Sequence, residues 1–197
     1  MTSRLAAPFA ATLLLAAACL EPRAVRMRFY TLPTEPAAGA EGRPLPSLGL
    51  GPVTLPAYLD RAELATRLSR EQVTYSGEDR WASPLAGQVW RALADDLRAR
   101  VPAGQVVPWP WPREQAPPLG VAVEIQAFEA GPDGAAVLEA RWTVTPGAGG
   151  APLASGSVRV REEPATRDAE GSVGALGRAL GALSRDVAAA LAALPAR

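Results

Sequence analysis

The sequence predicts a single α/β domain whose mixed central sheet includes an antiparallel meander and carries two long packed helices. Apolar and polar residues alternate through three segments between positions 121 and 162, with turn residues between the segments. This period of two is typical of half-buried strands. Apolar residues recur every three or four positions in residues 85–101 and again in 173–194, which indicates two amphipathic helices. A chain of 197 residues is long enough to bury one core.

Two short strands are predicted near the start of the domain. Residues 29–32 form a short aromatic and β-branched run that indicates an edge or first strand, and residues 34–46 have the composition of a loop. Residues 48–55 alternate apolar with small residues and predict a second strand, in which Pro52 causes a bulge or marks an edge. Residues 56–70 are predicted as a loop with a short helical turn.

The first long helix should follow a short strand at residues 72–76. Ser83 is the predicted N-cap and Pro84 the first helical position. A helix of about 17 residues is expected, ended by Pro102 and Gly104. Asp95 and Asp96 lie off its apolar stripe, and neighbours on a helix point about 100° apart, so this pair is expected on a solvated surface. A short strand is expected at residues 105–107.

Residues 121–130 and 135–145 are predicted to form a hairpin, because a clear turn signal separates them. A third strand is predicted at residues 153–162. Alternation places one set of side chains on one face: Val121, Val123, Ile125 and Ala127 on the first strand, with Phe128 opposite them. Ser172 is the predicted cap of the final helix. One apolar stripe docked on the sheet is favoured for this helix over a coiled coil.

The composition excludes several classes of protein. The 20 basic and 20 acidic residues balance, whereas a nucleic-acid-binding protein normally has a basic surplus. Every basic residue is Arg, and Lys, His and Asn are absent, which excludes a Ser-His-Asp triad, a Schiff-base lysine and a Walker lysine. The single Cys19 excludes an internal disulfide and a cysteine-only zinc site. We therefore predict a protein that is not an enzyme and has no metal or cofactor.

The first segment predicts export. Arg4 precedes 16 uncharged residues, 5–20, which is the pattern of a secretory signal and shorter than the roughly 20 residues of a membrane span. The sequence LAAAC at residues 15–19 resembles a bacterial lipobox. That resemblance implies a signal peptide at residues 1–18, and then an anchor and short tether at residues 19–26. The domain would occupy residues 27–197. An ordinary signal peptide cut after one of the alanines is the alternative.

Cys19 is the predicted lipid anchor. In lipoproteins of this kind the cysteine becomes the first residue and carries a covalent diacylglycerol and an N-acyl chain, and more than one acyl chain gives stable anchoring. A lone cysteine in an exported chain has no disulfide partner, and lipidation would consume its thiol. Asp after the cysteine favours inner-membrane retention in enterobacterial lipoproteins. Leu20 at that position therefore points, by resemblance, to the periplasmic face of the outer membrane.

Aromatic and arginine side chains are the candidate partner-binding groups, because these types dominate interface energies. The candidates are Tyr58, Arg61, Arg80, Trp81, Trp109 and Trp111. The two tryptophans of the PWPWP segment at residues 108–112 lie on an extended, preorganised stretch. For each group, a protein interface and a local packing or capping role both remain open.

Several stretches, taken in order, resemble the ABC-type transport auxiliary lipoprotein family, which includes PqiC. The stretches are FYTL at residues 29–32, LPAYLDR at 55–61 with RL at 67–68, DRWASPL at 79–85, LEARW at 138–142, and the final helix with LSR at 183–185. No single stretch is catalytic, and the resemblance rests on their order and spacing. Residues 36–46 match no part of the pattern.

The resemblance implies an outer-membrane lipoprotein that faces the periplasm. Its direct partner would be an MCE-domain protein, and its indirect partners an inner-membrane permease and an ATPase, which together move phospholipid or other hydrophobic molecules between membranes. The resemblance also implies assembly into a homo-oligomeric ring, which nothing in the residues themselves indicates. An outer-membrane lipoprotein that activates a cell-wall synthase or assists envelope assembly is the alternative of a different class, and neighbouring genes would separate the two.

Overall fold

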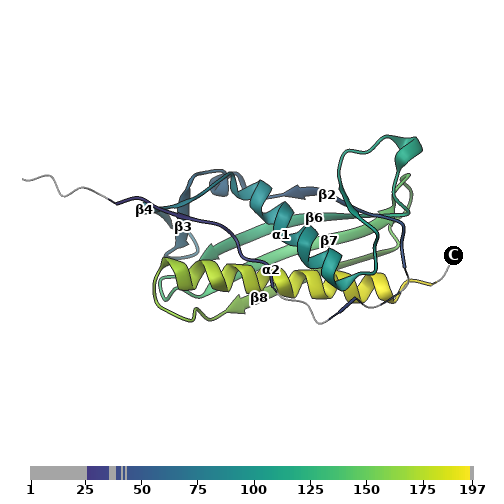
Figure 1. Ribbon diagram of the computed structural model, residues 1–197. Helices are drawn as coiled ribbons and strands as arrows, with labels where there is room; N and C mark the ends of the chain where they lie inside the picture. Colours follow the sequence, from purple (N-terminus) through teal and green to yellow (C-terminus); the bar gives the residue numbers. More distant parts are fainter. Residues whose placement is uncertain (1–25, 36–38, 41, 43, 196–197) are drawn as a thin grey trace, which may run out of the picture.

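The computed structural model describes residues 26–35, 39–40, 42 and 44–195. One mixed, curved sheet forms the first layer, and two helices packed on one face of it form the second (Figure 1). The α/β class predicted from the sequence is therefore confirmed. The described strands are β1 (Arg28–Tyr30), β2 (Leu48–Thr54), β3 (Glu63–Arg67), β4 (Val73–Trp81), β5 (Val106–Pro108), β6 (Leu119–Ala130), β7 (Ala136–Pro146) and β8 (Ala154–Glu162).

Strand β6 is the centre of the sheet. One edge of β6 pairs antiparallel with β7, which pairs antiparallel with β8, and this is the predicted meander. The other edge pairs in parallel with β2 and, at its far end, with β3. Beyond β2 lies β5, and beyond β3 lie β4 and then β1, which forms an edge as expected for the first strand. The bulge predicted at Pro52 is also present, because the pairing of β2 with β6 shifts between Leu50 and Val53.

Strand β3 corrects the expectation of a loop throughout residues 56–70. The predicted helical turn is a single 3-10 turn at Ala57–Leu59, and β3 follows it. Of the five β3 side chains only Leu64 is buried, so the sequence lacks the apolar alternation that marks a strand. Antiparallel pairing with β4 defines β3, and β4 itself runs five residues beyond the predicted end at residue 76.

A second bulge corrects the prediction for the inner face of β6. Ile125 lies opposite Ala140 while Ala127 lies opposite Glu139, so Gln126 is an extra residue and the side-chain alternation changes there. Phe128 consequently belongs to the core, where it is buried, and Ala127 is only partly buried. On β7 the alternation is regular, and Leu138, Ala140, Trp142 and Val144 are buried.

The two helices begin differently from the prediction. Helix α1 (Leu85–Arg100) has Pro84 at its N-cap, and no side chain caps it. The backbone carbonyl oxygen of Ser83 instead accepts a hydrogen bond from Gln88 Nε2 at 2.8 Å. Helix α2 (Ala169–Ala192) is capped by Asp168, whose carboxylate accepts from Gly171 N at 2.8 Å, rather than by Ser172. A carboxylate at this end also complements the helix dipole.

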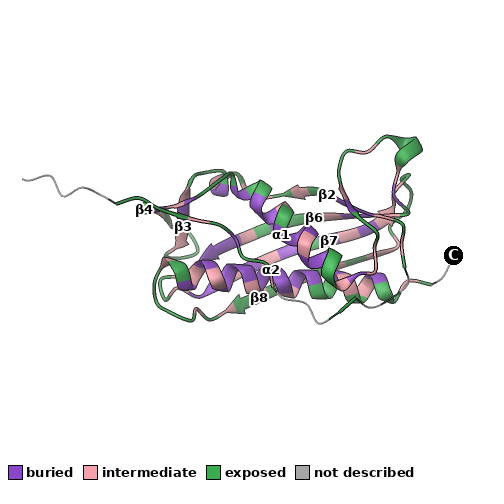
Figure 2. Cartoon of the chain, in the orientation of Figure 1, coloured by how far each residue is buried: buried purple, intermediate pink, exposed green. Residues whose placement is uncertain are grey.

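Helix α2 docks its apolar stripe on the sheet, as the sequence favoured, and packs beside α1. Figure 2 shows buried residues recurring along both helices, which lie over one face of the sheet. Trp142 on β7 donates its indole N–H to Asp186 on α2 at 2.7 Å. The core is one continuous cluster that extends from Leu32 to Leu191.

A strap formed by residues 32–35 crosses both helices. Leu32 N donates to Gln88 Oε1 at 2.8 Å, and Glu35 N donates to Asp96 Oδ1 at 3.0 Å. Asp96 is therefore buried, which corrects the prediction of a solvated pair, whereas Asp95 forms an exposed ion pair with Arg98. Burial raises the pKa of Asp96, although the Glu35 N–H and the charge of Arg100 oppose the shift.

Candidate docking surface

A proline-rich segment after β5 presents the most exposed tryptophan. Trp109 N donates to Leu50 O at 3.1 Å, which holds the backbone against β2. The Trp109 side chain remains 54% exposed. Gly51, with φ of 126°, lies under the Trp109 side chain, and a Cβ on Gly51 would be 2.9 Å from the Cβ of Trp109. The backbone of this segment is thus held close to the sheet while the indole is left to solvent.

Trp111, two residues later, has the opposite environment. Its ring lies over Gly49 and Gly120, where a Cβ would come within 2.5 Å and 3.1 Å of ring atoms respectively. Its indole N–H donates to Gly147 O at 2.9 Å. Trp111 therefore packs over the sheet and ties the segment to the turn between β7 and β8, while Trp109 is the exposed member of the pair.

Around these two side chains lies an open cavity of about 570 Å³, which we call the tryptophan cleft. Its lining residues are Trp109, Trp111, Arg113, Gly147, Ala148, Gly149 and Gly150. Arg113 is exposed and was not singled out from the sequence, although it follows PWPWP directly. An exposed indole, a guanidinium and accessible glycine backbone offer stacking and hydrogen bonding to a polypeptide, which is the usual chemistry of a protein interface.

Tyr58 and Arg61, two of the candidate partner-binding residues, lie in a local cluster at the other end of β6. Tyr58 OH donates to Glu129 Oε2 at 2.7 Å, and Arg67 Nε donates to the other oxygen of the same carboxylate. The Arg61 guanidinium lies 4.3 Å from the centre of the Tyr75 ring, and Tyr75 OH donates to Tyr58 O at 3.2 Å. This cluster joins the 3-10 turn, β3, β4 and β6.

Glu129 is the centre of this cluster, with a relative exposure of 2%. The bulge in β6 lets Phe128 N donate to Glu129 Oε2 at 2.8 Å, so three donors satisfy the carboxylate. Burial and the hydrogen bond to Glu129 raise the pKa of Tyr58 to about 12. The Tyr58 hydroxyl therefore stays protonated and remains a donor at neutral pH. The sequence offered no signal for Glu129 beyond its place in a strand.

Arg80 and Trp81 lie next to each other on β4 but in different environments. Trp81 is buried in the core, with 6% exposure. Arg80 is partly exposed, and its guanidinium lies 3.4 Å from a carboxylate oxygen of Glu63. Arg61 also pairs with Glu63, at 3.5 Å, so the two arginines share one carboxylate. Of the six candidate residues, the structure therefore brings Arg80 together with Tyr58 and Arg61, and in a separate place Trp109 with Trp111, whereas Trp81 belongs to the core.

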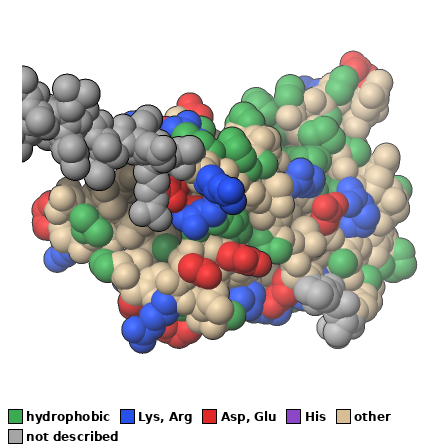
Figure 3. All heavy atoms as spheres, turned by 60° about the vertical axis from the view of Figure 1, so that its left-hand side comes forward, with side chains coloured by type: hydrophobic (Ala, Val, Ile, Leu, Met, Phe, Trp, Pro, Cys, Tyr) green, Lys and Arg blue, Asp and Glu red, His purple; other side chains and the backbone are tan. Residues whose placement is uncertain are grey.

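On the face that Figure 3 shows, basic and acidic side chains are interspersed, and neither charge is concentrated. Within the described part of the chain no group of three or more acidic or sulfur ligands could hold a metal. Among the same residues no helix is long and apolar enough to cross a membrane. Cys19 and the predicted signal peptide lie outside the described residues.

Comparison with known proteins gives the class of this molecule. The family described as ABC-type transport auxiliary lipoprotein component matches residues 30–188, so the chain belongs to that family, in agreement with the resemblance seen in the sequence. A crystal structure of an uncharacterized protein has a TM-score of 0.68 at 21% identity, covering 83% of this chain and 97% of its own. No curated protein matches the chain.

A second similar crystal structure is that of a Xanthomonas campestris protein of the DUF330 family. It has a TM-score of 0.67 at 14% identity and covers 82% of this chain and 92% of its own. Likeness at these levels of identity supports the fold alone. The fold and the family therefore define a transport auxiliary lipoprotein component.

Proposed function

We propose that this protein is an outer-membrane-anchored docking subunit of an intermembrane lipid transport system. Acyl chains on Cys19 hold it to the membrane at the periplasmic face. The tryptophan cleft contacts a periplasmic MCE-domain partner, which connects it to a permease and an ATPase on other chains. The observation that carries the proposal is the exposed Trp109 in an open cleft, on a chain that belongs to a transport auxiliary family.

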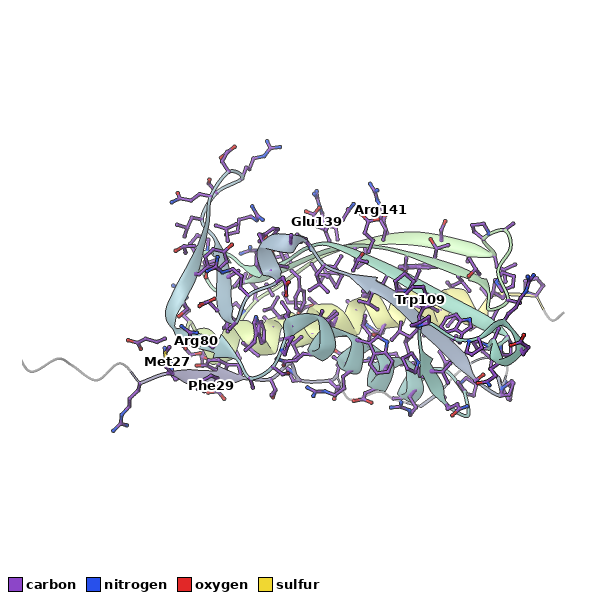
Figure 4. The ribbon with its side chains drawn as sticks, turned by 90° about the horizontal axis from the view of Figure 1, so that it is seen from above. Met27, Phe29, Arg80, Trp109, Glu139 and Arg141 are labelled. Carbon is purple, nitrogen blue, oxygen red and sulfur yellow. The ribbon has the colours of Figure 1, made fainter. Side chains whose placement is uncertain are left out.

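The position of the cleft supports this arrangement. Figure 4 shows Met27, close to where the described chain begins, at one end of the molecule, and Trp109 in the half away from it. A chain anchored through residues before Arg26 would thus leave the cleft away from its attachment point. A large aromatic side chain held on a short, braced segment loses little conformational entropy when a partner covers it.

Photocrosslinking in cells tests the proposed partner. A photoreactive amino acid at position 109 should crosslink to an MCE-domain protein, and the same residue at position 159, on the exposed outer side of β8, should not. The Trp109→Ala variant should recover at least about tenfold less partner, as expected for an interface hot spot. Crosslinking of a cell-wall synthase instead, or unchanged recovery by Trp109→Ala, would refute docking through this cleft.

Fractionation tests the anchor separately. The Cys19→Ser variant should leave the membrane fraction and appear in the soluble periplasmic fraction, because the acyl chains supply the stable attachment. An Arg159→Ala variant, which keeps Cys19, is the matched control and should remain in membranes. Retention of Cys19→Ser at the level of the unaltered protein would contradict anchoring through this residue.

A further inference from the structure

Two large apolar side chains are exposed together at the beginning of the domain. Met27 is 41% exposed and Phe29 is 63% exposed. Phe29 lies on the edge strand β1, and Met27 lies just before this strand. The two residues are two positions apart, so their side chains point to the same side. Among the large apolar side chains of the described residues, only Leu68 and Trp109 are exposed besides these two, and adjacent exposed apolar side chains are the kind of surface that contacts a protein or a membrane. Figure 4 places both beside Arg80.

The intervening residues hold this pair in position. Arg28 Nε donates to Asp79 Oδ1 at 2.7 Å, and Tyr30 OH donates to the same oxygen at 3.1 Å. These two side chains therefore turn toward β4, while Met27 and Phe29 turn away from Asp79. Parallel pairing places Phe29 opposite Arg80. The exposed pair is thus attached to the sheet and does not belong to a free chain end.

The short chain between Cys19 and this pair indicates which surface covers Met27 and Phe29. Arg26 comes only seven positions after Cys19 in the sequence, and a fully extended chain of seven residue steps reaches about 25 Å. If Cys19 carries acyl chains, Arg26 stays within that reach of the membrane interface, and Met27 and Phe29 follow it by one and three residues. Arg26 is exposed next to them and makes no ion pair within the described residues.

We propose that Met27 and Phe29 insert into the lipid interface of the membrane that holds the anchor, with Arg26 beside lipid phosphates. This inference rests on the proposed anchoring through Cys19. Charges of both signs are visible at this end of the molecule (Figure 3), so apolar insertion, more than attraction of a charged face, provides the contact. The contact orients the domain on the membrane and directs the tryptophan cleft away from it.

A single-site fluorescent label tests the insertion. Cys19 is the only cysteine and its thiol would be acylated, so Phe29→Cys provides one labelling site on the full lipidated protein. An environment-sensitive nitrobenzoxadiazole dye is attached there, and the protein is reconstituted into phosphatidylethanolamine–phosphatidylglycerol vesicles containing nitroxide-labelled lipid. The dye at position 29 should lose at least half of its fluorescence, as should a dye at Met27→Cys.

The matched control is Arg159→Cys, whose native side chain is 78% exposed on β8, and its dye should keep its fluorescence. Equal quenching at positions 29 and 159 would overturn the inference. Shielding of position 29 from aqueous iodide without quenching by lipid would also overturn it, because a protein surface would then cover the pair. Failure of the labelled protein to stay on vesicles overturns both this inference and the anchor, whereas retention without quenching overturns this inference alone.

Discussion

Glu129 is a buried carboxylate whose role depends on three donors from different parts of the chain. Tyr58, Arg67 and the backbone N–H of Phe128 all donate to it. A buried polar group costs free energy unless it is fully hydrogen-bonded. Here the hydrogen bonds satisfy both oxygens, so the carboxylate can join the end of β6 to β3 and to the 3-10 turn.

Replacement of Glu129 should therefore lower stability in a graded way. Glu129→Ala removes the acceptor of Tyr58 and Arg67 and should reduce the free energy of unfolding by about 2–3 kcal/mol. Glu129→Gln keeps the shape and one carbonyl acceptor and should cost less. Urea unfolding followed by circular dichroism measures both, with the exposed Glu124→Gln on the same strand as control. Equal stability of Glu129→Ala and the unaltered protein would contradict this account.

At the scale of elements, the strap of residues 32–35 explains two glycines of α2. A Cβ on Gly177 would lie 2.5 Å from Pro33 Cγ and 2.9 Å from Pro33 O. Gly181 lies under Glu35 in the same way, and the Glu35 carboxylate also pairs with Arg100 and Arg185. Glycine normally weakens a helix, and here it gives the strap room to cross.

Alanine substitutions on α2 separate the weakening of the helix by glycine from the room that glycine leaves for the strap. Gly177→Ala should lower the free energy of unfolding by about 1–3 kcal/mol, because the added methyl meets the backbone of Pro33. Gly174→Ala, where the nearest atom to an added Cβ is Arg178 Nη1 at 3.7 Å, should raise it by up to about 1 kcal/mol. Thermal unfolding of the two variants under identical conditions checks the difference. Stabilisation by Gly177→Ala would show that the strap leaves room for a methyl group at position 177.

At the scale of the whole molecule, one continuous core connects the strap, both helices and the sheet. No second buried cluster divides the described residues into independent units. A domain of this kind is expected to unfold cooperatively. The polar outer side of β8 and the apolar inner side of β7 place the helices on one face only (Figure 2).

Unfolding should accordingly show a single transition. Trp81 and Trp142 are buried, Trp90 and Trp111 are partly buried, and Trp109 is exposed, so four of the five tryptophans report on packing. Its urea midpoint should coincide with the midpoint from far-ultraviolet circular dichroism, which reports on the helices. Trp109→Phe is the control that removes the exposed fluorophore. Separate midpoints would indicate that the helices and the sheet unfold as distinct units.

The sequence by itself determined the class of fold, the meander, the two long helices and the family. Each of these depends on a local signal, either a period of two or 3.6 residues or a short ordered motif. The inner face of β7 and the buried stripe of α2 were predictable because regular alternation continues without interruption along each element.

Only the tertiary structure decided which polar groups are buried and which aromatic groups are exposed. Asp96 is buried because Glu35, 61 residues earlier, donates to it, and Trp111 is covered because glycines on β2 and β6 leave space for its ring. Strand β3 exists through its pairing with β4, and the bulge at Gln126 moves Phe128 into the core. These features depend on partners distant along the chain, and local periodicity carries no information about such partners.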